Sequence, residues 1–188
     1  MNPIDLAAQQ LGLNESDKAA ALSDYLNNGG ANLDPATTAW CAAFVNATLQ
    51  QSGQQGTGSN MARSFMNWGQ PVDQPQRGDL AVFSRGDPNG PYGHVGFFDG
   101  YNPDGTIRVL GGNQGDAVSV ASYSPNALLG FRRGENALAT TPQAQPQNAL
   151  AEPKPQEWQY TANQLDPAMF RSRRMDMQPI DYMQFRVG

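Results

Sequence analysis

The chain contains one cysteine and one histidine, and the sequence around each suits chemistry. Cys41 follows turn and cap residues at 34–38 and begins a segment with helical spacing that ends at Gly53, so we expect it in the first turn of a helix. The helix N-terminus favours the reactive thiolate, and free first-turn N–H groups can bind an oxyanion. The alternative is a small buried hydrophobe, which is the usual state of a free cysteine.

The histidine, His94, opens a segment rich in β-favouring residues, so we expect it at the start of a strand. A histidine there can reach a cleft and act as the base for a thiol. Cysteine peptidases need one cysteine and one histidine that are distant in sequence and adjacent in space. The two residues are 53 positions apart, which leaves room for a helix, a loop and a strand. Alone, His94 would be read as an ordinary surface or core histidine.

A third polar residue, Asn113, follows the next predicted strand, residues 106–110. A turn at 102–105 joins this strand to that of His94, so the two should form a hairpin. The hairpin brings Asn113 near the site, where its side chain can accept a hydrogen bond from the imidazole and hold the ring. Its neighbours Gly-Gly-Asn-Gln-Gly are also turn formers, and a plain turn role is an equal alternative.

The order of several short motifs resembles a known family. The segments are WCAAFV at 40–45, RGDLAVF at 77–83 and GHVGF at 93–97. Together they resemble the CHAP and NlpC/P60 cysteine peptidases, over a stretch from about Ile4 to Arg133. The segments VLGGNQ at 109–114 and LLGFRR at 128–133 are most similar to a phage-associated subgroup.

The resemblance implies a papain-like α+β fold and hydrolysis of an amide bond in bacterial peptidoglycan, by an N-acetylmuramoyl-L-alanine amidase or a stem-peptide endopeptidase. It implies Cys41 as the nucleophile, His94 as the base and Asn113 as the orienting residue, without a metal or cofactor. Many CHAP members carry a glutamate just before the asparagine-containing turn, whereas this chain has Gly111 and Gly112 there.

The remaining segments predict an α+β fold in which N-terminal helices pack on a small antiparallel sheet. Helices are expected over 4–12, from 14–17 to Gly29, from Cys41, and over 63–69. Asp79 is expected to cap local backbone N–H groups before the strand that precedes His94. The five predicted strands are 80–83, the strand that starts at His94, 106–110, 118–120 and 130–133.

Composition excludes several classes of function. A single cysteine rules out an intramolecular disulfide and, with a single histidine, a Cys/His zinc site. Residues 1–135 hold seven Lys and Arg against twelve Asp and Glu, which argues against nucleic acid as a partner. We expect no secretion signal and no membrane partner, because no basic segment precedes an apolar run and no stretch has transmembrane length.

Composition also divides the chain into three parts. Residues 1–135 are the expected catalytic domain, and residues 136–156, with four prolines, are an expected linker. Residues 157–188 recover aromatic residues, methionine and arginine, which are favoured at interfaces, so we expect a tail that anchors the protein to phage tail or baseplate proteins. The alternatives are a disordered extension, or contact of the basic residues 171–174 with an anionic wall polymer.

These observations lead to one main function and two others. The first is a phage peptidoglycan hydrolase, held in the virion or the host cytoplasm before release and acting at the cell wall. The second is a structural tail or baseplate component that keeps the hydrolase fold for assembly or wall binding. The third is a bacterial effector or toxin delivered by a secretion system.

Overall fold

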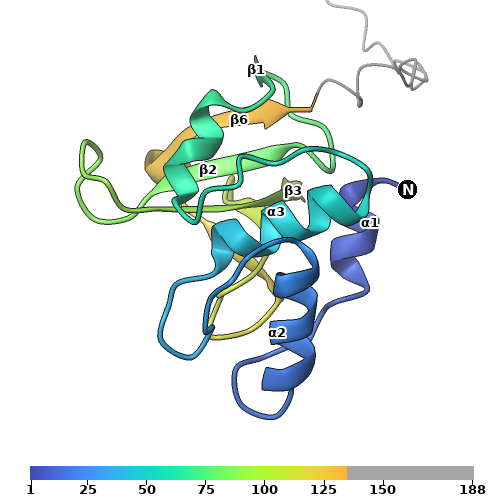
Figure 1. Cartoon of the computed structure of the whole chain (residues 1–188). Helices are drawn as coiled ribbons and strands as arrows, with labels where there is room; N and C mark the ends of the chain where they lie inside the picture. The colour runs from blue at the N-terminus through green and yellow to red at the C-terminus, as the bar shows by residue number, and fades with distance from the viewer. Residues whose placement is uncertain (135–188) are drawn as a thin grey trace, which may run out of the picture. The chain divides into compact units, whose positions relative to one another are not determined.

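The computed structural model describes residues 1–134 of the chain (Figure 1). Within them the helices are α1 (Pro3–Ala8), α2 (Ala19–Asn28), α3 (Cys41–Gln51) and the 3-10 helices η1 (Ala62–Asn67) and η2 (Pro125–Ala127). The strands are β1 (Gln70–Val72), β2 (Leu80–Ser84), β3 (Gly93–Tyr101), β4 (Ile107–Gly111), β5 (Ser119–Tyr123) and β6 (Leu128–Arg133). The predicted linker (136–156) and tail (157–188) lie outside the described residues.

The strands of the described residues form one antiparallel sheet in the order β1-β6-β2-β3-β4-β5. This sheet, with helices separate from it in sequence, confirms the predicted α+β class. The nine-residue strand β3 is paired with β2 on one side and β4 on the other. The predicted hairpin is confirmed, since β3 and β4 are joined at residues 102–105, where the N–H of Asn102 donates to the carbonyl of Thr106 at 2.9 Å.

The sheet has one strand more than the five predicted, because β1 was not expected. This strand is three residues long, contains Pro71 and, among the described strands, pairs only with β6, at the edge of the sheet. Proline cannot donate a ladder hydrogen bond, which confines it to edges and bulges, and three residues are too few to display an alternating pattern. The helix expected over 63–69 is the 3-10 helix η1, which ends at Asn67.

The first two helices differ from prediction at their ends. The helix α1 begins with Asn2 as its cap, whose side chain accepts a hydrogen bond from Ile4, and it ends at Ala8, before the predicted stop at residue 12. The helix α2 begins at residue 19 because Asn14, expected to cap it, instead accepts hydrogen bonds from the backbone N–H groups of Ser16 and Asp17 in a local turn.

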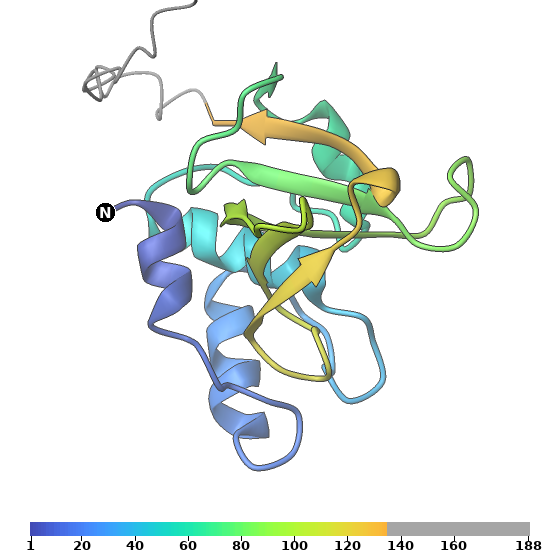
Figure 2. The same cartoon turned by 180° about the vertical axis from the view of Figure 1, so that it is seen from behind.

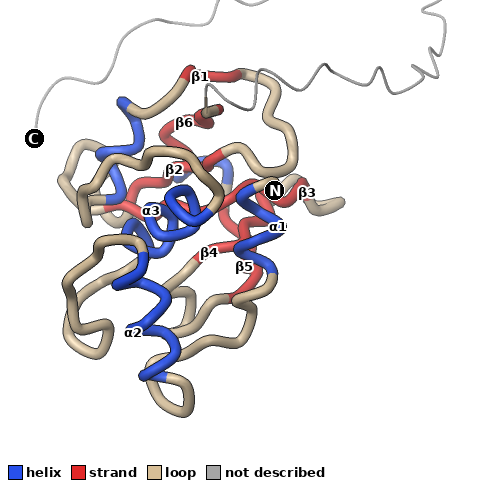
Figure 3. The backbone as a smooth tube through the Cα atoms, turned by 45° about the vertical axis from the view of Figure 1, so that its right-hand side comes forward, coloured by secondary structure: helices blue, strands red, loops and turns tan. Residues whose placement is uncertain are grey.

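The central helix is α3. It packs against β3 and β4, while α1 and α2 pack against α3 (Figures 1 and 3). We predicted one buried face, but every residue from Cys41 to Leu49 is buried. The polar side chains among them are hydrogen-bonded, as when Thr48 pairs with the hydroxyl of Tyr25 at 2.8 Å and Asn46 donates to the carbonyl of Ser59 at 2.9 Å. A helix enclosed on all sides holds its first residue at a fixed place.

Apolar residues pack on both faces of the sheet. The face toward α3 carries Leu80, Val82, Val95, Phe97 and Leu110, and the other face carries Ala81, Phe83, Phe98, Val109 and Phe131. Phe83 and His94 are direct partners in the β2–β3 ladder. Directly opposed residues project to the same side, so His94 lies on the face of Phe83.

The start of β2 is held by Asp79. Its carboxylate accepts a hydrogen bond from the backbone N–H of Gln76 at 2.6 Å, which confirms the predicted capping role. It also forms two hydrogen bonds with the guanidinium of Arg133, at 2.8 and 2.6 Å. The two side chains are only 5% and 15% exposed, so this ion pair ties the end of β6 to the turn before β2.

We predict that Asp79→Ala lowers the free energy of unfolding by about 3 kcal/mol, because it leaves the buried charge of Arg133 without its partner. Urea unfolding measures the change. The control is Asp5→Ala, which removes an ion pair with Arg77 whose side chains are half exposed and should cost about 1 kcal/mol or less. Equal losses in the two variants would contradict the assignment of a stabilising buried pair.

Candidate active site

The predicted position of Cys41 at a helix N-terminus is confirmed, since it is the first residue of α3. Trp40 occupies the cap position, and its side chain forms no capping hydrogen bond. Asp34, expected to contribute to the cap, accepts a hydrogen bond from Ala36 within its own turn at 3.0 Å. The first-turn N–H groups of α3 therefore remain available to a bound group, and the backbone N–H groups of Cys41 and Ala42 lie at the thiol.

His94 is the second residue of β3, so its predicted place at the start of a strand is also confirmed. Its side chain is buried, and its ring stacks on that of Tyr123 with 5.0 Å between centroids and 14° between planes. Tyr123 also stacks on Phe83 of β2 at 4.7 Å. Tyr123 belongs to β5, which β3 and β4 separate from β2 in the sheet. The sheet must therefore curl so that β5, the yellow strand in Figure 2, approaches β2.

The structure brings Cys41 close to the segment that carries His94. The backbone N–H of Val95, the residue after His94, forms a hydrogen bond with the thiol. This N–H is free to do so because the ladder between β3 and β4 begins only at Phe97. The thiol group also lies close enough to Tyr123 to raise the pKa of its hydroxyl, and the ring of His94 stacks on Tyr123. The thiol of the only cysteine therefore lies beside the strand segment that begins with the only histidine.

The hydrogen-bond partner of His94 is Gln114. The amide oxygen of Gln114 lies 3.1 Å from Nε2 of the ring and accepts a second hydrogen bond from the hydroxyl of Tyr123 at 3.0 Å. The amide nitrogen donates to the carbonyl of Ser119 at 2.7 Å, so the oxygen must face the imidazole. We therefore assign the proton to Nε2, which leaves Nδ1 as the acceptor. Nδ1 is buried and has no hydrogen-bond partner among the described residues.

The hydrogen bond that we predicted for Asn113 is thus formed by its neighbour. Asn113 has the left-handed backbone angle φ of 56°, and its side chain forms no hydrogen bond within residues 1–134. This conformation reverses the chain directly after β4, so that Gln114 folds back over the end of the strand and reaches His94.

The glycines before Asn113 explain why Gln114 can take this place. A side chain at Gly111 would begin 3.4 Å from Nε2 of His94 and 3.1 Å from the amide oxygen of Gln114. At Gly112 a side chain would overlap the ring of Trp40, 2.4 Å away, so only glycine lets the turn approach the start of α3. The two consecutive glycines at 111 and 112 are therefore the sequence signal that could have indicated Gln114.

The charges of the pair are set by burial. Burial raises the pKa of the Cys41 thiol, while hydrogen bonds from the backbone of Val95 and Ala42 and the positive charge of Arg85 oppose this. Burial lowers the pKa of His94 to about 4, although the hydrogen bond to Gln114 acts in the other direction. At neutral pH the pair is therefore a neutral thiol and a neutral imidazole. We expected the helix N-terminus to favour the thiolate; its backbone N–H groups do lower the pKa of the thiol, but burial raises that pKa by more.

The pKa of His94 predicts a loss of stability in acid. The unfolded chain has a histidine pKa near 6.5, so between pH 6.5 and 4 it binds more protons than the folded chain. The contribution of neutral His94 is fully present above pH 6.5 and is lost as the pH falls toward 4, by about 3 kcal/mol. Urea unfolding measures the free energy of unfolding at pH 7 and at pH 4. The drop between these pH values should be smaller for His94→Gln than for the wild type, and equal drops would contradict the assignment.

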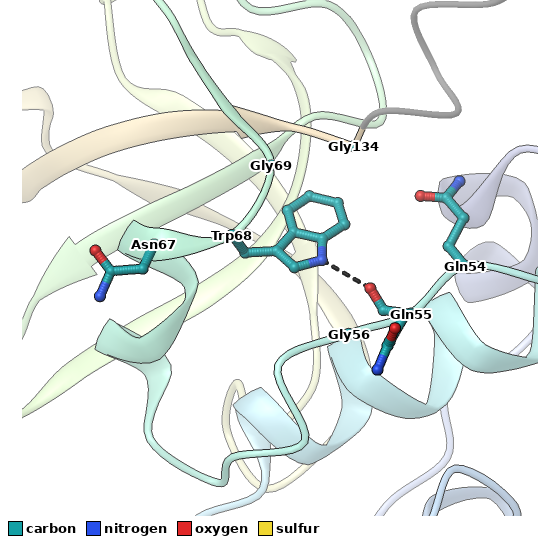
Figure 4. A pocket seen from close by; sticks show the side chains of 7 residues that line it. All are labelled: Gln54, Gln55, Gly56, Asn67, Trp68, Gly69 and Gly134. Atoms are coloured by element: carbon teal, nitrogen blue, oxygen red, sulfur yellow. Dashed lines mark hydrogen bonds between the residues drawn. The ribbon is translucent and has the colours of Figure 1, made fainter.

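A separate hollow lies at the other end of α3. It has a volume of about 340 Å³ and is lined by Gln54, Gln55, Gly56, Asn67, Trp68, Gly69 and Gly134 (Figure 4). The indole N–H of Trp68 donates to the carbonyl of Gln55 at 2.8 Å. The eleven residues of α3 separate this hollow from Cys41 by about 15 Å along the helix axis. It is therefore distinct from the site of Cys41 and His94.

Residues 1–134 contain no group of three or more His, Cys, Asp or Glu side chains placed to hold a metal ion. In the same residues, no helix combines the length and the apolar character that a membrane crossing needs.

Comparison with known proteins identifies one domain. Residues 33–113 match the family model of the CHAP domain. The matched segment includes Cys41, His94 and Asn113, and ends one residue before Gln114. No curated protein matches the chain.

Proposed function

The chain carries a domain of the CHAP family, and from this premise we propose that it cleaves an amide bond of bacterial peptidoglycan with Cys41 as nucleophile. CHAP domains are typically hydrolases that act on peptidoglycan. The observation that carries the proposal is Nδ1 of His94, a buried proton acceptor that has no hydrogen-bond partner among residues 1–134 and lies in the segment whose backbone contacts the Cys41 thiol. A buried polar atom without a partner is uncommon and calls for a functional explanation.

In the proposed reaction, Nδ1 of His94 takes the thiol proton as Sγ of Cys41 attacks the amide carbonyl. The backbone N–H groups at the start of α3 then stabilise the oxyanion. His94 returns the proton to the leaving amine, and the acyl group remains on Cys41 as a thioester. A water molecule, deprotonated by His94, hydrolyses the thioester and restores the thiol.

Gln114 is the third residue in this proposal, in place of Asn113. Its amide oxygen holds Nε2–H of His94 and keeps Nδ1 free of a proton. When the imidazole becomes charged during the reaction, the same oxygen stabilises the cation. Tyr123 supports this arrangement by stacking on the ring and donating its hydroxyl proton to Gln114.

The proposal is tested by digestion of purified sacculi, followed by mass spectrometry of the soluble fragments. An amidase releases stem peptides without sugar, and an endopeptidase releases sugar-bearing fragments with shortened or unlinked peptides. Each outcome supports the proposal and identifies the bond. Sacculi that remain intact, from Gram-negative and Gram-positive cells alike, would favour the structural tail or baseplate component.

We also propose that the hydrolase belongs to a phage and is carried in the virion, or held in the host cytoplasm, until it acts at the cell wall. Support comes from the resemblance of residues 109–114 and 128–133 to phage-associated proteins and from the composition of residues 157–188. A chain that ends at Glu135 should still digest sacculi but should no longer sediment with phage particles. Retained sedimentation would contradict an anchoring role for the tail.

A further inference from the structure

Arg85 follows directly after β2, beside the strand that carries His94. Its backbone N–H donates to the carbonyl of Tyr92 at 3.2 Å, so the ladder between β2 and β3 extends one pair beyond Ser84 and residue 93. Side chains alternate between the faces of a sheet. Arg85 and Tyr92 are each two residues from the directly paired Phe83 and His94, so all four project from the same face.

The guanidinium of Arg85 has no carboxylate partner within residues 1–134, whereas Arg77, Arg108 and Arg133 each form an ion pair there. It also forms no side-chain hydrogen bond in that part of the chain, and the residue is exposed to solvent. Its positive charge nevertheless lies close enough to lower the pKa of both Cys41 and His94. A solvent-accessible cation therefore stands next to the reacting pair.

The loop that follows Arg85 is braced. The guanidinium of Arg63 donates to the carbonyl of Tyr92 at 3.1 Å and to that of Pro88 at 2.6 Å. The side chain of Tyr92 is 71% exposed, although it is large and aromatic. The bracing keeps the backbone beside Arg85 in place, so its side chain and the ring of Tyr92 project from a fixed part of the sheet face that carries His94.

We propose that Arg85, with Tyr92 beside it, binds a free carboxylate of the wall peptide next to the amide bond that is cleaved. This inference rests on the proposed function and specifies its substrate as an anionic peptide. A guanidinium pairs with a carboxylate through two parallel hydrogen bonds, and an aromatic face adds contact area for the peptide. The chain has a net charge of −5, so a cation that has no carboxylate partner among residues 1–134 provides a local attraction for an anion at this place.

The test uses two synthetic wall peptides of the same sequence, one with the carboxylate beside the scissile amide free and one with it converted to a primary amide. We expect the wild type to cleave the acid with a kcat/KM about tenfold higher than the amide. Arg85→Gln should lose that preference through a higher KM for the acid, while its KM for the amide stays the same. The matched control is Lys18→Gln, which removes an exposed positive charge at the start of α2.

An unchanged preference for the acid in Arg85→Gln would overturn the inference. Calorimetric binding of both peptides to Cys41→Ala, with and without Arg85→Gln, tests the subsite independently of turnover. Tighter binding of the acid that depends on Arg85 supports the subsite, and equal binding of acid and amide overturns it. If the wild type binds the acid but cleaves neither peptide, the proposed function fails while the subsite stands.

Discussion

Replacing Cys41 with alanine is expected to lower the release of soluble wall fragments at least about 1,000-fold while the protein stays folded. The variant removes the nucleophile, so no thioester can form. It removes only the sulfur from a side chain that is 5% exposed, which should cost about 1 kcal/mol of stability. Dye release from labelled sacculi measures the rate, and thermal unfolding measures the stability.

Cys41→Ser is the matched variant, because its side chain has nearly the same shape. A serine hydroxyl is a far weaker nucleophile beside a histidine whose pKa is only about 4, so this variant should also be inactive. Wild-type rates in either variant would show that Cys41 is one of the small buried hydrophobes that free cysteines usually are.

Replacing Gln114 with leucine is expected to lower kcat about 100-fold with little change in KM. The variant removes the oxygen that holds Nε2–H of His94, so the ring can take the other tautomer or rotate away from the thiol. It also removes the acceptor of the Tyr123 hydroxyl, which is one reason to measure thermal stability as well.

Asn113→Gly is the control for Gln114→Leu. Glycine accepts the left-handed conformation at this position, so the variant removes the side chain without straining the turn. We expect its kcat to remain within about threefold of wild type. A large loss in Asn113→Gly with near wild-type activity in Gln114→Leu would restore Asn113 as the third residue and contradict the network described above.

The sequence allowed the fold class and the environment of the two reacting side chains to be predicted. Helical spacing after a turn placed Cys41 at a helix N-terminus, and β-favouring residues with a turn at 102–105 placed His94 in a hairpin. These features are local, since they depend on residues within about ten positions of each other. The short edge strand β1 has no such pattern and was missed.

The third residue and the charge of the thiol could not be predicted in this way. Gln114 reaches His94 only because Asn113 adopts a left-handed conformation and Gly112 lets the turn approach Trp40. The pKa of Cys41 depends on how much protein surrounds it, and α3 is buried on all sides instead of one. Both features arise from tertiary packing, which periodicity along one segment does not report.

The most direct test of the central claim, that a wall amide is cleaved through a thioester on Cys41, is to digest sacculi in the presence of hydroxylamine. Hydroxylamine competes with water for a thioester, so the new acyl end should appear partly as a hydroxamate, which mass spectrometry distinguishes from the acid. Our account predicts that the hydroxamate fraction rises with hydroxylamine concentration in the wild type, and that neither product forms with Cys41→Ala. Release of the acid alone at every concentration, or equal products from Cys41→Ala, would contradict it.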